Sequence, residues 1–222
     1  MAMTTLTSEA LHTAGISAEP YSAPAQRSAF VLVDGQYDFV EGGALGVEGG
    51  TRALAGVAEF LAAHAANYAV CAVTRDWHID PGAHFSEQPD FAESWPRHCV
   101  AGTTGAELHP QALRALDNAA AAHPGQIRID VTKGEYSAAY SGFEGATAGG
   151  TSLADALRGH EVASIDVAGI ATDYCVRATC LDGLAAGFEV RLLVPLSAGV
   201  AEPSSVEALA EIRRRGVHLL VV

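Results

Sequence analysis

Short apolar runs recur along this chain, and loops or segments with helical spacing separate them. Six such runs predict strands over residues 29–33, 68–73, 127–131, 165–170, 189–194 and 217–222. Helical spacing of apolar residues occurs over 51–66, 152–158, 173–186 and 206–215. Strands that are apolar on both faces are typical of a parallel sheet that helices cover on both sides. The pattern therefore predicts an α/β fold with three layers (α/β/α) and a mostly parallel, six-stranded sheet.

The length of 222 residues fits one domain, because single domains reach about 250 residues. We expect this domain to span residues 28–222. Residues 1–27 are rich in Ala, Ser, Thr and Pro, and we predict a flexible or loosely docked extension there, with a short helix over 8–14. Residues 78–110 show little regular pattern. An irregular insert of that size in a compact domain is usually functional.

The composition argues against several classes of protein. A hydrophobic content of 49% with 18% charged residues excludes an intrinsically disordered chain. The net charge of −13 argues against a nucleic-acid partner, because binding phosphates needs a basic face. Apolar runs stay short of the roughly 18 residues of a membrane span, and the first residues lack the pattern of a signal peptide. We therefore expect a cytoplasmic protein without a membrane partner, whose four cysteines are reduced.

Lysine is almost absent from this chain. Of the 13 basic residues, Lys133 is the one lysine and the others are arginines. A lysine can shift its pKa and transfer a proton, which a guanidinium does not do. Lys133 is therefore either a chance survivor of an arginine-rich composition or a functional residue.

Polar and reactive side chains follow the predicted strands at their carboxyl ends. Asp34, Asp76, Lys133 and the segment 172–175 each come directly after a strand. In an open parallel sheet these ends meet at one edge, where ligands bind. Cys175 would lie in the first turn of a helix with Thr172 or Asp173 as N-cap, a position that favours a thiolate. We predict Cys175 as nucleophile, with Asp34 as general base and acid.

A second cluster combines a carboxylate with imidazoles. Asp76 and His78 are two residues apart at a strand end, and His84 and His98 follow in the irregular insert. Two or three imidazoles with one carboxylate suit a divalent ion such as Zn, Fe or Mn. Unrelated loop histidines are the alternative. The buried cysteines Cys71 and Cys180 are predicted to be structural.

Aromatic residues lie near the same edge. Phe39 and Trp95 could pack in the core or form the walls of a stacking pocket for a flat ring, and both interpretations stay open at this point. Asp38 is predicted to be a structural residue that supports the metal histidines.

Five longer stretches carry a resemblance to a known family. They are VDGQYDFVEGGALGVEGG (33–50), RDWHIDPGAHFSEQPDF (75–91), SWPRHCVAGTTGAELHP (94–110), KGEYSAAYSGFEG (133–145) and VAGIATDYCVRATCLDGLAAG (167–187). From about residue 29 to 222 the chain resembles the isochorismatase-like cysteine hydrolases, and among them the bacterial nicotinamidases/pyrazinamidases. Gly35, Tyr37 and Tyr174 depart from the usual pattern; histidine would be expected at 174.

The resemblance implies a role for each matching residue. It implies a catalytic triad of Asp34, Lys133 and Cys175, and an oxyanion hole from the backbone N–H groups of Ala171 and Cys175, beside a cis bond between Ile170 and Ala171. It also implies residues that bind the metal and residues that bind the ring of the substrate. These are Asp76, His78, His84 and His98 for one divalent metal ion, and Phe39, Trp95 and Tyr140 for the substrate.

The implied reaction is hydrolysis of nicotinamide to nicotinate and ammonia through a thioester, with pyrazinamide as a further substrate. The expected partner is therefore a small aromatic amide, and the expected assembly is a monomer or a small homo-oligomer. A related cysteine amidase that acts on a carbamoyl or ureido compound is the alternative within the same class. A non-catalytic binding module on the same fold is the alternative from another class.

Overall fold

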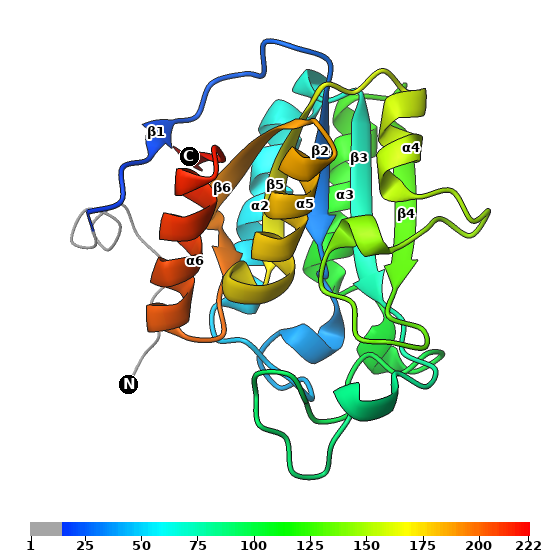
Figure 1. Cartoon of the computed structure of the whole chain (residues 1–222). Helices are drawn as coiled ribbons and strands as arrows, with labels where there is room; N and C mark the ends of the chain where they lie inside the picture. Colours follow the sequence, from blue (N-terminus) through cyan, green and yellow to red (C-terminus); the bar gives the residue numbers. More distant parts are fainter. Residues whose placement is uncertain (1–14) are drawn as a thin grey trace.

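The computed structural model of the chain describes residues 15–222, so the helix predicted over 8–14 lies outside the described residues. This part of the chain forms one parallel sheet with the strand order β1-β7-β6-β5-β2-β3-β4 (Figure 1). The strands are β1 (Glu19–Pro20), β2 (Ser28–Val33), β3 (Val70–Asp76), β4 (Ile127–Lys133), β5 (Ser164–Ile170), β6 (Glu189–Ala198) and β7 (His218–Val221). The predicted α/β class and parallel sheet are confirmed.

The prediction of six strands is wrong, because within residues 15–222 the sheet has seven. The additional strand β1 comes from the N-terminal extension and pairs Glu19 and Pro20 with Leu220 and Val221 of β7. A two-residue Glu-Pro strand has no apolar alternation that a sequence pattern could detect. Proline is compatible with the position because β1 is an edge strand.

Side chains hold this N-terminal segment to the sheet. The Arg191 guanidinium donates to both carboxylate oxygens of buried Asp166, at 2.6 and 2.5 Å, and to the backbone oxygen of Ser22 at 3.0 Å. The Tyr21 hydroxyl lies 3.3 Å from the hydroxyl of buried Tyr68. The segment around residue 21 is therefore attached by backbone and side-chain contacts together.

Helices cover both faces of the sheet, as the three-layer prediction required. The α-helices of residues 15–222 are α2 (Gly50–His64), α3 (Pro110–Ala122), α4 (Leu153–Gly159), α5 (Arg177–Ala185) and α6 (Glu202–Arg214). In Figure 1, α2 and α3 lie behind the sheet, while α4, α5 and α6 lie in front of it. Alternate side chains of β2 explain both layers: Phe30 and Leu32 pack with α2 and α3, and Ala29, Val31 and Val33 pack in the opposite core.

The sequence pattern did not predict α3. His109 caps this helix by accepting from the Gln111 N–H, and Pro110 occupies its first turn, which is a favoured place for proline. Its buried face consists largely of alanines (Ala112, Ala115 and Ala119) with Leu116. Alanine gives little apolar contrast, so the helical period is weak in the sequence.

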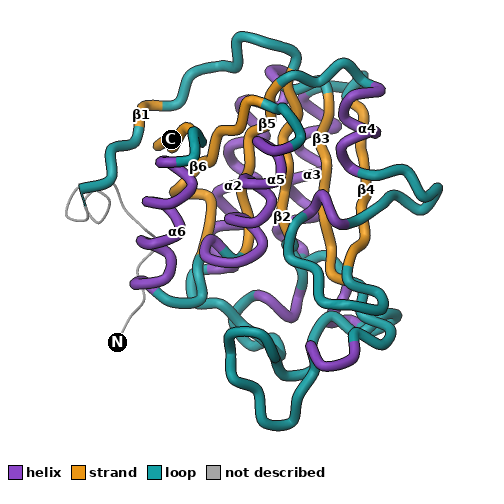
Figure 2. The backbone as a smooth tube through the Cα atoms, viewed as in Figure 1, coloured by secondary structure: helices purple, strands orange, loops and turns teal. Residues whose placement is uncertain are grey.

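The carboxyl ends of the strands carry the long loops. Between β3 and α3 the chain contains 3₁₀ turns at Gly82–His84 and Thr104–Ala106 and isolated β-bridges, His78 with Val100 and Phe85 with Trp95. This irregular segment lies below the sheet in Figure 2. The loop after β2 and the π-helical turn Thr172–Val176 after β5 lie at the same end. No helix among residues 15–222 is long and apolar enough to cross a membrane.

Candidate active site

Three reactive side chains meet at the carboxyl edge of the sheet. Asp34 follows β2, Lys133 ends β4, and Cys175 lies in the π-helical turn after β5. Lys133 Nζ is 2.9 Å from Asp34 Oδ2 and 3.8 Å from Cys175 Sγ, and it also donates to Asp76 and to the backbone oxygen of Ala139. All three predicted triad residues are buried and adjacent. The structure thus brings them together from strands far apart in the sequence.

Local backbone geometry places Asp34. Gly169 of β5 pairs with Val33, and a Cβ at Gly169 would collide with the Val33 carbonyl, so glycine allows this close approach. Asp34 itself has φ of 48°. The Thr74 hydroxyl donates to Asp34 Oδ1 at 2.7 Å, while Oδ2 forms the ion pair with Lys133. Both carboxylate oxygens of Asp34 are therefore held in place beside the thiol.

The electrostatics of the triad follow from its burial. Burial raises the pKa of Asp34 above its usual value, and the charge of Lys133 opposes this only in part. Burial lowers the pKa of Lys133, but the charges of Asp34 and Asp76 outweigh it and raise that pKa well above the usual value. Lys133 is therefore an ammonium ion at neutral pH.

Burial raises the pKa of the Cys175 thiol well above the usual value and outweighs the favourable charge of Lys133. A buried thiol of this kind needs a base to remove its proton, which is the role predicted for Asp34.

The predicted side-chain N-cap at Thr172 or Asp173 is wrong, because no side chain caps the turn Thr172–Val176. The Asp173 carboxylate instead accepts from the N–H groups of Val200 and Ala201 and holds the start of α6.

The predicted metal ligands form a second cluster beside the triad. Ligand atoms of His78, His84 and His98 all lie within 4.8 Å of one another, and the three side chains are buried. Asp76 Oδ2 lies 3.4 Å from His78 Nε2 and 3.8 Å from His98 Nε2. The other oxygen of Asp76 contacts Lys133, so one carboxylate connects the two clusters.

The donor set fits a divalent ion. His78 Nδ1 lies 2.6 Å from the backbone oxygen of Gly134, and His98 Nδ1 lies 2.7 Å from that of Pro96. If each Nδ1 carries the proton and donates it to the carbonyl, each Nε2 keeps a free lone pair that faces the cluster. Histidines that bind metals are commonly oriented by such a hydrogen bond from the other ring nitrogen. His78 Nε2 and His84 Nδ1 are buried and make no hydrogen bond in the described chain, although Asp76 Oδ2 lies 3.4 Å from His78 Nε2. Burial, with the neighbouring imidazoles, lowers the pKa of His84 to about 4, so it is neutral and able to bind a metal.

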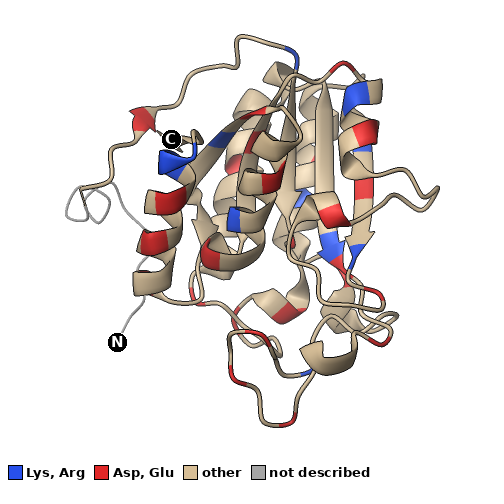
Figure 3. Cartoon of the chain, viewed as in Figure 1, with Lys and Arg blue, Asp and Glu red and all other residues tan. Residues whose placement is uncertain are grey.

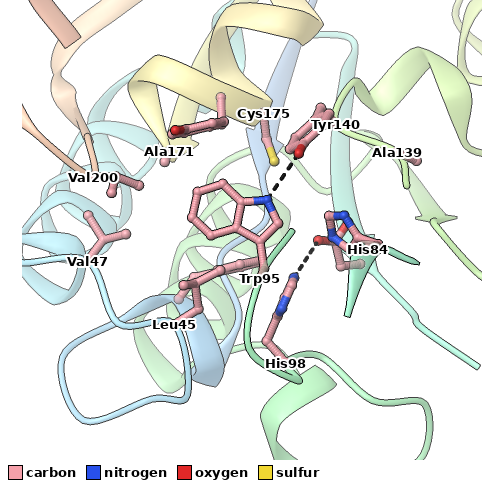
Figure 4. A pocket seen from close by; sticks show the side chains of 13 residues that line it. Leu45, Val47, His84, Trp95, His98, Ala139, Tyr140, Ala171, Cys175 and Val200 are labelled. Carbon is pink, nitrogen blue, oxygen red and sulfur yellow. Dashed lines mark hydrogen bonds and ion pairs between the residues drawn. The ribbon is translucent and has the colours of Figure 1, made fainter. Parts of the chain in front are cut away.

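A pocket opens onto both clusters. Figure 4 shows Cys175 above the Trp95 indole and His84 and His98 beside it, with Leu45, Val47 and Val200 on the opposite wall. The predicted substrate-binding residues Phe39, Trp95 and Tyr140 all line this pocket. Trp95 Nε1 donates to the Tyr140 hydroxyl at 3.1 Å. A flat ring that enters would meet aromatic walls, the thiol and the histidines at once.

Sequence reasoning missed two positioning residues. Gln36 is fully buried; its side chain accepts from the Asp76 N–H at 2.8 Å and donates to the backbone oxygens of Asp76 and Ala106 at 2.8 and 2.9 Å. Thr74 orients Asp34, as described above. The available signal for Thr74 was its position directly after the predicted strand 68–73, and the two-residue spacing from Asp34 was the signal for Gln36.

Two other expectations concern the backbone and Asp38. The Ile170–Ala171 peptide bond is cis, as the resemblance implied. The Ala171 carbonyl oxygen accepts from the N–H groups of Tyr174 and Val176, at 3.1 and 3.0 Å. Asp38 accepts from the Cys99 N–H at 2.7 Å, directly after His98, which fits the predicted supporting role.

Comparison with known proteins agrees with this geometry. Residues 28–221 match the family model described as Isochorismatase domain. The nicotinamidase/pyrazinamidase of Mycobacterium tuberculosis is 46% identical over 192 residues, which cover 86% of this chain and 97% of that protein.

Two solved structures share the fold. One is the pyrazinamidase of Pyrococcus horikoshii in complex with zinc, with a TM-score of 0.70, 36% identity and coverage of 88% of this chain and 99% of that chain. The other is PnC1 from L. infantum in complex with nicotinate, with a TM-score of 0.71, 29% identity and coverage of 91% and 98%. With the family model matched over nearly all of residues 28–222, the chain belongs to the isochorismatase family.

Proposed function

We propose that this protein hydrolyses nicotinamide to nicotinate and ammonia, and that pyrazinamide is also a substrate. The observation that carries the proposal is the position of Lys133 Nζ, which contacts Asp34 and Asp76 and lies 3.8 Å from Cys175 Sγ in a pocket beside three histidines. Relatives named for this activity support it, at 46% identity in one case.

The pocket residues account for binding of the ring. We assign Phe39 and Trp95 as its walls, with Tyr140 holding the indole in place. Asp76, His78, His84 and His98 would hold one divalent ion, with Zn, Fe and Mn as the candidates. When bound, such an ion supplies a positive charge and an open position for a ring nitrogen or a water molecule.

The triad accounts for the cleavage. The carboxylate of Asp34 accepts the proton of Cys175, and the thiolate forms a bond to the amide carbon. Backbone N–H groups of Ala171 and Cys175 are the proposed donors to the oxyanion; one such donor is typically worth about 3 kcal/mol. The C–N bond then breaks as Asp34 returns its proton to the leaving ammonia.

A thioester remains on Cys175, and one water molecule completes the reaction. Asp34 takes one proton from that water, the hydroxide oxygen bonds to the acyl carbon, and the C–S bond breaks to release nicotinic acid, which loses its proton to solvent and becomes nicotinate. Asp34 then returns its proton to the Cys175 thiolate. Lys133 keeps its charge throughout, and it stabilises the carboxylate and the thiolate in turn.

The same triad could cleave a carbamoyl or ureido compound, so the substrate is tested directly. Ammonia release is measured on nicotinamide, pyrazinamide, benzamide and a linear ureido acid, with protein of assayed metal content. We expect the pyridine and pyrazine amides to give the highest kcat/KM. A higher kcat/KM on the ureido acid would contradict the proposal.

The nucleophile is tested with matched cysteine variants. Cys175→Ala should lower kcat by three orders of magnitude or more. Cys180→Ala, also at a buried free cysteine but outside the pocket, should stay active. If Cys175→Ala were as active as Cys180→Ala and the parent protein, Cys175 would not be the nucleophile.

A cytoplasmic location and independence from nucleic acid remain proposals. The net charge of −13 supports the second. Along the described chain, positions of Lys and Arg are interspersed with positions of Asp and Glu (Figure 3).

A further inference from the structure

The loop of residues 86–94 connects two walls of the pocket. It begins after His84 and Phe85 and ends at Trp95. The backbone N–H of Trp95 donates to the backbone oxygen of His84 at 2.8 Å, and the backbone N–H of Ser86 donates to the backbone oxygen of Trp95 at 2.9 Å. These two bonds close the loop at its base. Any movement of the loop as a unit is therefore transmitted to His84 and Trp95.

The tip of the 86–94 loop has its own internal structure. Asp90 Oδ1 accepts from the N–H groups of Ala92, Glu93 and Ser94 at 3.0, 2.9 and 2.8 Å. These bonds hold the pKa of the Asp90 carboxyl well below its usual range. The tip is therefore a preformed turn, and its attachment to the rest of the protein depends on other residues.

Two tyrosine hydroxyls provide that attachment. The Tyr174 hydroxyl donates to the backbone oxygen of Phe91 at 3.2 Å, and the Tyr140 hydroxyl reaches that of Ala92 at 3.5 Å. The Tyr174 ring also meets the Trp95 indole edge to face, with centroids 5.0 Å apart. Tyr174 directly precedes Cys175, so it connects the loop to the turn that carries the thiol.

We propose that Tyr174 is a positioning residue whose hydroxyl latches the 86–94 loop across the pocket and thereby holds Trp95 as a wall for an aromatic amide. The inference rests on the proposed function for its substrate class. Tyr174 takes no part in bond breaking: its hydroxyl is committed to Phe91, while Asp34, Lys133 and Cys175 carry the proton transfers. The hydroxyl therefore governs affinity for the ring.

The kinetic test is Tyr174→Phe, which removes one oxygen and keeps the ring. One neutral hydrogen bond corresponds to about a three- to tenfold change in an equilibrium constant. We expect KM for nicotinamide to rise by about that factor, with kcat not lowered. The matched control is Tyr136→Phe, because Tyr136 is 68% exposed and its hydroxyl has no hydrogen bond in the described part of the chain. Kinetics of Tyr174→Phe equal to those of the control, or a fall in kcat at unchanged KM, would overturn the proposal.

A second readout does not depend on turnover. The chain has two tryptophans, so in a Trp77→Phe background Trp95 is the only one. Loss of the latch should make Trp95 fluorescence more accessible to acrylamide in Tyr174→Phe than in Tyr136→Phe. Equal quenching would overturn the latch even if KM changed. If the parent protein released no ammonia from nicotinamide, the proposed function would fail, and the quenching comparison would still decide the latch.

Discussion

Lys133 Nζ lies 2.9 Å from Asp34 Oδ2, and both side chains are completely buried. Two opposite charges without access to water depend on each other, because each offsets the desolvation of the other. The sole lysine of the chain is thus an ammonium ion that is held between two carboxylates and adjacent to the thiol.

Replacement of this lysine should affect both activity and stability. Lys133→Arg keeps the charge but not the compact shape, so Asp34 and Cys175 are displaced, and kcat/KM should fall by about 100-fold or more. Lys133→Met leaves two buried carboxylates without their cation and should lower the free energy of unfolding by about 3 kcal/mol. Urea unfolding and steady-state kinetics measure the two effects. A normal rate in Lys133→Arg would mean that the lysine is incidental.

The hydroxyl of Thr74 should tune the pH dependence of the reaction. It donates to Asp34 Oδ1 and so stabilises the carboxylate, which keeps the pKa of Asp34 from rising further under burial. In Thr74→Val this bond is lost and the pKa rises. The base must be deprotonated, so the acid limb of kcat/KM against pH should move to higher pH. An acid limb identical to that of the parent protein would count against Asp34 as the base.

Loss of one imidazole should remove the metal. His78→Ala deletes a buried ring nitrogen of the proposed ligand cluster, so metal content should fall strongly, and activity with it. His160→Ala, at a half-buried histidine outside the cluster, is the control and should retain its metal. Chelation of the parent protein, followed by addition of Zn, Mn or Fe, should restore activity with the ion that the site uses. Full metal and normal kinetics in His78→Ala would contradict the ligand assignment.

Glu41 should contribute stability that depends on pH. Burial raises its pKa, but hydrogen bonds from Thr51 and Gly49 at the start of α2 together outweigh this and lower the pKa to about 2. A lowered folded-state pKa gives stability that is present above the unfolded value of about 4.5 and is lost as pH falls toward 2. Because Glu41 is largely exposed, Glu41→Gln should cost about 1 kcal/mol at pH 7.

The measurement compares the free energy of unfolding of Glu41→Gln and the parent protein at pH 7 and at pH 4. The difference should shrink at the lower pH. The control is Glu59→Gln, at an exposed position of the same helix, and it should show no such trend. If the difference in free energy of unfolding grew toward low pH, it would contradict the lowered pKa of Glu41 in the folded protein.

The sequence predicted those parts of the fold that depend on strong apolar contrast. The strands around Val31, Ala72 and Val167 are apolar on both faces, so their position and their burial between helices could be inferred, and with them the edge where Asp34, Lys133 and Cys175 meet. Glu19 and Pro20 pair with β7 through their backbone, so their side chains show no apolar pattern in the sequence. The buried alanines of α3 likewise give little apolar contrast.

The sequence pattern could not predict how deeply each site residue is buried or which residues it contacts. The position of Cys175 after a strand indicated a nucleophile that Asp34 deprotonates, but the burial that raises the pKa of its thiol depends on packing of the whole edge. Asp173 was a reasonable N-cap for its own helix, yet it holds the start of α6, because the loop after β6 returns beside it. Such contacts join residues about 30 positions apart and have no local signature.

The carboxylate of Asp76 belongs to both halves of this site, since one oxygen meets the ammonium and the other faces the imidazoles. An ion bound at the imidazoles would therefore share the carboxylate that also neutralises Lys133. A change at Asp76 would disturb both halves at once, whereas a change at His84 would touch the imidazole half alone.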